Sequence, residues 1–105
     1  MDMRKLMQQA QQMQQQMLDV QESLKDERVQ ASAGGGMVEV TSSGTGQLVS
    51  LKIDPEAVDT DDMEMLEDMI LAAVNEAARQ ASELSEQRMG DVTGGMGGMP
   101  GLPGM

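Results

Sequence analysis

The sequence predicts an α+β fold with the order α-β-β-β-α, and three observations support this fold. A stretch near the amino terminus has no glycine or proline, and its apolar residues recur at steps of three and four. Three short runs of alternating apolar residues follow, separated by glycine-containing turns. An alanine-rich stretch with helical spacing comes last. We expect one domain over residues 1–90 and a disordered Gly/Met/Pro-rich tail over residues 91–105.

The first helix is expected over residues 3–27. It is rich in Gln, Met and Leu, which are good helix formers. Its apolar positions form a heptad seam, and a narrow stripe on so long a helix requires a partner. The partner is either the protein's own core or the same helix of a second subunit. The seam consists of Met3, Leu6, Ala10, Met13, Met17, Val20 and Leu24.

A three-stranded antiparallel sheet is expected over residues 29–54. The first turn is the sequence GGG at 34–36 and the second is SSGTG at 42–46. Such a meander has one apolar face, and we expect the helix that follows to cover it. The residues of that face are Val29, Ala31, Ala33, Val38, Val40, Val49, Leu51 and Ile53.

The second helix is expected over residues 60–89. Thr60 or Asp61 is the predicted N-cap, and Gly90 is the predicted stop. The acidic residues of the first turns lie where the helix dipole favours negative charge. An alanine-rich stripe allows close approach of a sheet or a second helix, and it comprises Leu66, Ile70, Ala73, Ala77, Ala81 and Leu84.

The composition excludes several classes of function. The chain has no Cys, no His and no aromatic residue, so the usual activated nucleophiles and general bases are missing. We expect no enzyme, no catalytic residue, no cofactor and no small-molecule substrate. The acids of residues 59–68 begin a helix and lack the glycine-containing turn of a calcium loop, so no metal site is expected. No stretch resembles a signal peptide or a membrane span, which predicts a cytoplasmic protein.

The negative charge is concentrated in one segment. The formal net charge is -11, and by itself it disfavours binding to a nucleic acid. Residues 59–90 carry two basic and nine acidic groups, whereas residues 1–28 carry four basic and five acidic groups. In a two-fold dimer each cation appears twice, so a positive cleft between projecting helices is compatible with a negative chain.

The stretch "GGGMVEVTSSGTGQLVSLKIDPEAVDTDDMEMLEDMILAAVNEA" resembles the central signature of the YbaB/EbfC family of bacterial nucleoid-associated proteins. The opening "MRKLMQQAQQMQ" and the Gly/Met/Pro tail are similar to that family as well. The resemblance implies a tweezer-like homodimer with paired projecting helices. It also implies binding to double-stranded DNA, altered DNA conformation, and a role in nucleoid organisation and gene regulation.

Members of this family commonly carry basic side chains at positions where this sequence has Glu39 and Thr45. By elimination, the candidate DNA-binding residues are the cations of the two helices: Arg4, Lys5, Lys25, Arg28, Arg79 and Arg88.

Two functions stay open. The first is a homodimer that binds duplex DNA through phosphate contacts, with low sequence selectivity and strong salt dependence. The second is a protein-interaction module whose Met/Gln-rich arms grip a partner's apolar helix without binding DNA directly. The resemblance favours the first, while the net charge and Glu39 favour the second.

Overall fold

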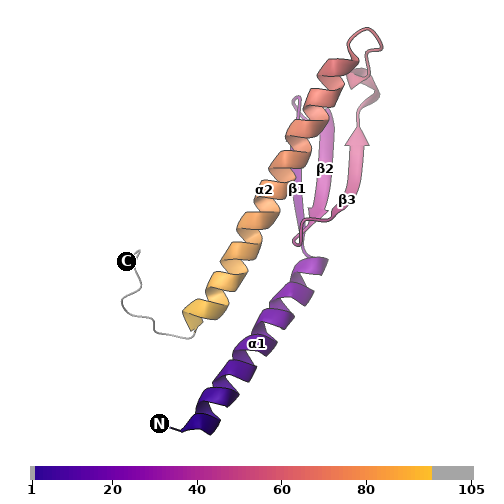
Figure 1. Ribbon diagram of the computed structural model, residues 1–105. Coiled ribbons are helices and arrows are strands. Elements are labelled where there is room, and N and C mark those ends of the chain that lie inside the picture. Colours follow the sequence, from indigo (N-terminus) through magenta and orange to yellow (C-terminus); the bar gives the residue numbers. More distant parts are fainter. Residues whose placement is uncertain (1, 96–105) are drawn as a thin grey trace, which may run out of the picture.

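The computed structural model describes residues 2–95 and has the predicted α-β-β-β-α order (Figure 1). The molecule is elongated, with extents of 71 × 28 × 16 Å. Helix α2 lies along the sheet and continues beyond it, where α1 runs beside its second half. The elements are α1 (Met3–Asp26), β1 (Arg28–Ala33), β2 (Val38–Ser43), β3 (Leu48–Ile53), the short 3-10 helix η1 (Pro55–Ala57) and α2 (Met63–Gly95).

The sheet is an antiparallel meander in the order β1-β2-β3. Its first turn contains three consecutive glycines, Gly34, Gly35 and Gly36, with φ of 64°, 69° and 95°. These left-handed conformations are accessible to glycine at little cost, which explains the GGG sequence. Between β2 and β3 the register shifts at Thr41 and Ser42.

The core lies between α2 and the first two strands. Val38 and Val40 of β2 are buried beneath the helix, and Ala73 and Ala77 of α2 are buried on the side of the helix that faces the sheet. Because alanine has a short side chain, the helix backbone approaches the sheet closely. The predicted apolar stripe of the second helix is therefore confirmed.

The prediction that this helix covers the whole apolar face was wrong for β3. Of the predicted face, Ile53 packs against the core, but Val49 and Leu51 are 51% and 49% exposed, because α2 packs on β1 and β2. Leu48, on the same strand, is 51% exposed as well. A helix with its side chains is about 10 Å wide, and neighbouring strands lie about 4.8 Å apart. One helix therefore covers two strands, and the third strand keeps an uncovered apolar surface.

Helix α1 is most firmly packed at its inner end. Leu24 is 2% exposed, and its carbonyl accepts a hydrogen bond of 2.9 Å from the backbone amide of Gly44. A Cβ atom on Gly44 would lie 2.8 Å from that carbonyl oxygen, so the close approach requires glycine. Toward the other end the helix is open to solvent, and Met3 is 69% exposed.

The predicted N-cap of the second helix was wrong. Helix α2 begins at Met63, and the Oδ1 atom of Asp62 accepts a hydrogen bond of 3.2 Å from the Met65 amide. The turn before it is held by Asp59, whose Oδ1 atom accepts from the Asp61 amide at 2.9 Å. Because aspartates occupy several neighbouring positions, each offers a cap, and the sequence alone does not choose between them.

The predicted stop at Gly90 was also wrong. Helix α2 runs through Gly90 to Gly95, so residues 91–95, assigned to the tail, are helical. Gly90 does not adopt the positive φ of a terminating glycine. Its cost in a helix interior, about 1 kcal/mol relative to Ala, does not end the helix. The rest of the predicted tail, residues 96–105, lies outside the described residues.

Candidate nucleic-acid interface

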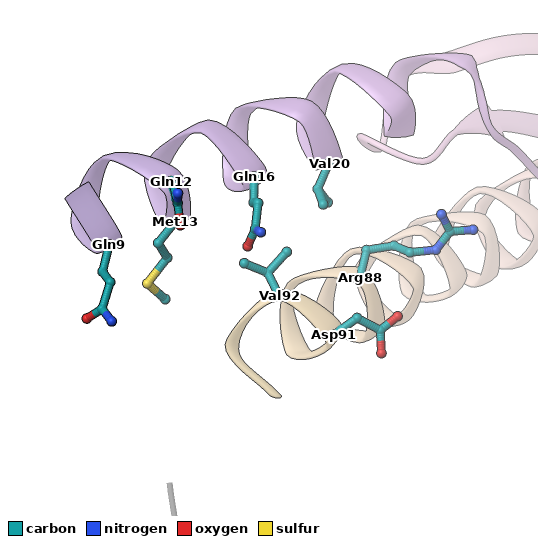
Figure 2. Close-up of a pocket in the computed structure, with 8 residues that line it drawn as sticks. All are labelled: Gln9, Gln12, Met13, Gln16, Val20, Arg88, Asp91 and Val92. Carbon is teal, nitrogen blue, oxygen red and sulfur yellow. The ribbon is translucent and has the colours of Figure 1, made fainter. Parts of the chain in front are cut away.

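The candidate site is the part of the molecule where α1 and the end of α2 extend beyond the sheet. An open groove of about 630 Å³ separates the two helices, and Figure 2 shows amide and apolar side chains of α1 facing the end of α2. Eight residues line this groove, which we call the α1–α2 groove: Gln9, Gln12, Met13, Gln16, Val20, Arg88, Asp91 and Val92.

The heptad seam of α1 divides between two environments. Leu24 is buried at the inner end, and Met13 and Val20 are half-buried and face the α1–α2 groove. Met3, Leu6, Ala10 and Met17 are exposed. The protein's own core therefore accounts for the inner end of the seam, and the outer half is without a covering surface in the described part of this chain.

Arg88 connects the two arms, although its side chain is still 40% exposed. Its Nη2 atom donates a hydrogen bond of 2.5 Å to Oε1 of Glu27, the residue that follows α1. The other carboxylate oxygen of Glu27 is buried and has no hydrogen-bond partner among the described residues. Because this ion pair joins the end of α1 to α2, its main effect is on the placement of the arms.

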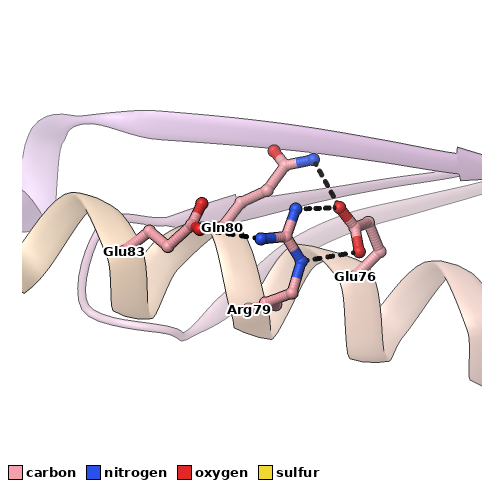
Figure 3. A network of polar contacts seen from close by, with 4 residues as sticks. All are labelled: Glu76, Arg79, Gln80 and Glu83. Carbon is pink, nitrogen blue, oxygen red and sulfur yellow. Dashed lines mark hydrogen bonds and ion pairs between the residues drawn. The ribbon is translucent and has the colours of Figure 1, made fainter.

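Arg79 is compensated by two carboxylates on its own helix (Figure 3). Its Nε and Nη2 atoms donate to Glu76 at 3.0 and 2.5 Å, and Nη1 lies 2.9 Å from Glu83. The hydrogen bond from Arg79 is the main reason that the pKa of Glu76 is lowered to about 2, and a hydrogen bond from Gln80 lowers it further. The same bond raises the pKa of Arg79. One cation between two anions gives a negative surface, which does not attract phosphate.

The cations at the inner end of α1 also have local partners. The Nζ atom of Lys25 lies 3.1 Å from Oε2 of Glu22. The Nη1 atom of Arg28 donates to the carbonyls of Lys25 and Glu27, at 2.8 and 2.9 Å. A cation at these carbonyls complements the negative end of the helix dipole. These two residues therefore stabilise the carboxyl-terminal end of α1.

Arg4 and Lys5 are the candidate cations available to a ligand. Both are exposed, and neither side chain forms an ion pair with any residue in the described part of the chain. The backbone amide of Arg4 donates a hydrogen bond of 2.9 Å to Oδ1 of Asp2, the N-cap of α1. No acidic residue occurs in residues 3–18, so the outer part of α1 has a net positive charge.

The structure does not bring the six predicted cations into one cluster. Arg4 lies in the first turn of α1, whereas Arg28 begins β1, just beyond the other end of that helix. The 24 residues of α1 span about 36 Å at 1.5 Å per residue. Sequence reasoning also left out Lys52, which lies on β3 opposite Glu39 of β2. The alternation of the strands is a signal that could have placed both residues on the outer, polar face of the sheet.

Among residues 2–95 no group of acidic side chains is arranged to hold a metal ion. Within the same residues no helix combines the length and the apolar character needed to cross a membrane.

The fold defines a small α+β protein with projecting helical arms, and α1 carries exposed cations at its outer end. Residues 1–96 match the model of the YbaB/EbfC DNA-binding family, and the chain belongs to this family. The resemblance found in the sequence is thereby confirmed. The description of this family is that of DNA-binding proteins.

Relatives match over most of their length. A nucleoid-associated protein of Pelotomaculum thermopropionicum is 50% identical over 95 residues, which cover 90% of this chain and 90% of the relative. One from Chloroflexus aurantiacus is 50% identical over 96 residues, with 91% and 96% covered. The crystal structure of an uncharacterized protein from Helicobacter pylori is similar, with a TM-score of 0.75, 28% identity, and 92% and 99% of the two chains covered.

Proposed function

We propose that this protein is a homodimer that binds double-stranded DNA with low sequence selectivity through the outer part of α1. In this proposal it alters the conformation of the DNA and contributes to nucleoid organisation and gene regulation, in the cytoplasm at the nucleoid. One observation carries the proposal: Arg4 and Lys5 are exposed and free of ion pairs within the described residues, on a helix segment without acids. The names of its relatives as nucleoid-associated proteins support it.

The net charge of -11 does not decide the matter, because the position of the charges counts more than their sum. At physiological ionic strength the screening length is about 8 Å. Nine of the acids lie in residues 59–90, whereas residues 3–18 carry two cations and no acid. Phosphate contacts from such cations give affinity without base readout.

Two uncovered apolar surfaces support a homodimer. One is the exposed apolar side of β3, with Leu48, Val49 and Leu51, and the other is the outer half of the α1 seam. A second copy that covers β3 would double the cations at the arms. Exposed apolar patches of this kind on a small domain are typical of interfaces.

The dimer is tested by Leu51→Asp, with Ser50→Asp as the matched control on the opposite face of the same strand. We expect sedimentation equilibrium to show a dimer for the wild type and for Ser50→Asp, and a monomer for Leu51→Asp. Circular dichroism checks that all three proteins fold. A wild-type monomer at micromolar concentration would contradict the homodimer.

DNA binding is tested by titrating a fluorescent duplex with the protein at several salt concentrations. The logarithm of the binding constant is expected to fall linearly with the logarithm of the salt concentration, by about 0.9 per neutralised phosphate. Several duplexes of unrelated sequence but equal A·T content should bind with similar affinity. A folded dimer that binds no duplex even at low salt would overturn the proposal.

A second function is favoured by the α1–α2 groove. Met13, Val20 and Val92 give it an apolar strip, and methionine adapts to irregular partners. As a protein-interaction module, the chain would retain protein partners from cytosol treated with nuclease and would not bind duplex DNA. Binding of purified duplex DNA would count against this alternative.

A further inference from the structure

Helix α1 has a third surface besides the seam and the side that faces α2. Arg4, Gln8, Gln11 and Gln15 follow one another at steps of four, three and four residues, which places them on one face of the helix. All four are exposed. The three glutamines, together with Gln12, line a shallow open hollow on the helix surface. We call Gln8, Gln11 and Gln15 the amide stripe.

The amide stripe lies on the side of α1 away from its apolar seam. Gln15 is nine residues from Leu6, which is about 180° around a helix of 3.6 residues per turn. The side chains that face α2 are others, including Gln9 and Gln16 (Figure 2). The stripe therefore remains accessible whether the seam is covered by a second subunit or not.

The chemistry of the stripe is unusual for a solvent-exposed helix face in so acidic a chain. The stripe itself is uncharged, and Arg4 precedes it on the same face. The first acid on this side is Asp19, which accepts a hydrogen bond of 3.0 Å from Nε2 of Gln15. An acid within the stripe would be repelled by phosphate, and none occurs in residues 3–18. Each amide both donates and accepts hydrogen bonds.

We propose that the amide stripe contacts the edges of adenine bases in the major groove of duplex DNA, while Arg4 and Lys5 contact the adjacent phosphates. The inference rests on the proposed function and deepens it. A glutamine amide matches the N6 donor and N7 acceptor of adenine in a bidentate pair, and the major groove admits an α-helix. The acid-free segment 3–18 is about 24 Å long at 1.5 Å per residue.

The test compares three proteins on three duplexes at one salt concentration, by fluorescence anisotropy. The stripe variant carries Gln8→Ala, Gln11→Ala and Gln15→Ala, and alanine preserves the helix. The control carries Gln30→Ala, Gln47→Ala and Gln87→Ala, three exposed glutamines outside α1. The duplexes have equal length: one rich in A·T pairs, one with G·C pairs only, and one A·T-rich duplex in which a C–H group replaces N7 of every adenine.

The wild type and the control are expected to bind the A·T-rich duplex about tenfold more tightly than the other two. The stripe variant should bind all three duplexes alike, with the affinity that the wild type has for the G·C duplex. Equal binding of the two A·T-rich duplexes by the wild type would overturn the inference, and so would a stripe variant that behaves like the wild type. Neither result would affect the proposed binding to duplex DNA, which fails if the wild type binds no duplex at all.

Discussion

The molecule has two halves that differ in how they are packed. The sheet half consists of the three strands and the part of α2 that lies on them, and the arm half consists of α1 and the end of α2. In the sheet half, the alanines of α2 pack against β1 and β2, and Val38, Ala73 and Ala77 are fully buried. In the arm half, α1 runs beside the end of α2 across an open groove, with Leu24 buried at its inner end and Met3 exposed at its outer end. The sheet half therefore contains most of the buried core, whereas the outer parts of the arms leave their side chains exposed.

The two halves also differ in how their cations are used. Arg79, on the part of α2 that crosses the sheet, lies between Glu76 and Glu83. Arg4 and Lys5, on the arm, form no side-chain ion pair within residues 2–95. In such an acidic chain, the partners of a basic residue therefore indicate better than its position whether it is available to a ligand.

The largest effect on stability is expected in the sheet half. Ala77→Leu adds volume at a fully buried position and should lower the free energy of unfolding by about 1–3 kcal/mol. Ala72→Leu, on the exposed side of the same helix, should change it by less than about 0.5 kcal/mol. Urea unfolding followed by circular dichroism measures both, and equal effects would contradict the packing described here.

In the arm half, Gly90→Ala distinguishes a continuing helix from a helix that stops. Gly90 lies within α2, and nothing lies within 4 Å of a Cβ atom built on it. The substitution should raise the free energy of unfolding by about 0.5–1 kcal/mol, because alanine is the better residue in a helix interior. A terminating glycine with positive φ would give a loss of stability instead.

The ion pair between Glu27 and Arg88 links the two helices of the arm half. In a double-mutant cycle with Glu27→Gln and Arg88→Met, we expect a coupling energy of about 0.5–1 kcal/mol, since both side chains are partly exposed. The single variant Arg88→Met should cost more than the double variant because it leaves the partly buried Glu27 carboxylate alone. A coupling energy of zero would show that the pair does not brace the arms.

The smallest effect concerns the pH dependence of the Arg79 network. The pKa of Glu76 is lowered to about 2 from 4.5, so the folded state holds this proton less tightly than the unfolded state does. Its contribution is therefore complete above pH 4.5 and is lost as the pH falls toward 2. Carbon NMR of the Glu76 carboxyl should show the low pKa in the wild type and an ordinary pKa in Arg79→Met.

Much of the fold could be predicted because periodicity reports which face of each element is buried. The seams of both helices and the alternation in the strands gave the correct order of elements. The N-cap of α2 and the helical residues after Gly90 could not be predicted, because several aspartates compete as caps and glycine is only weakly unfavourable in a helix. The uncovered apolar side of β3 follows from the width of one helix.

The candidate site could be predicted in part. The spacings of Glu22 to Lys25 and of Glu76 to Arg79 are those of helical ion pairs, so these cations could have been set aside from the sequence. The pairing of Arg88 with Glu27 spans 61 positions and requires the fold. Arg4 and Lys5 differ from the other candidate cations, because each of the others has an ion-pair or hydrogen-bond partner for its side chain.

The most direct test of this account compares two double variants that remove the same charge. Arg4→Ala with Lys5→Ala changes the arm, and Lys25→Ala with Arg79→Ala changes cations that have carboxylate partners. We expect the arm variant to lose at least about tenfold in affinity for duplex DNA, with a salt dependence reduced by about two phosphates per subunit, or about four per dimer. The other variant should bind like the wild type. Equal losses in both variants, or a loss only in the second, would contradict the assignment of DNA binding to the outer part of α1.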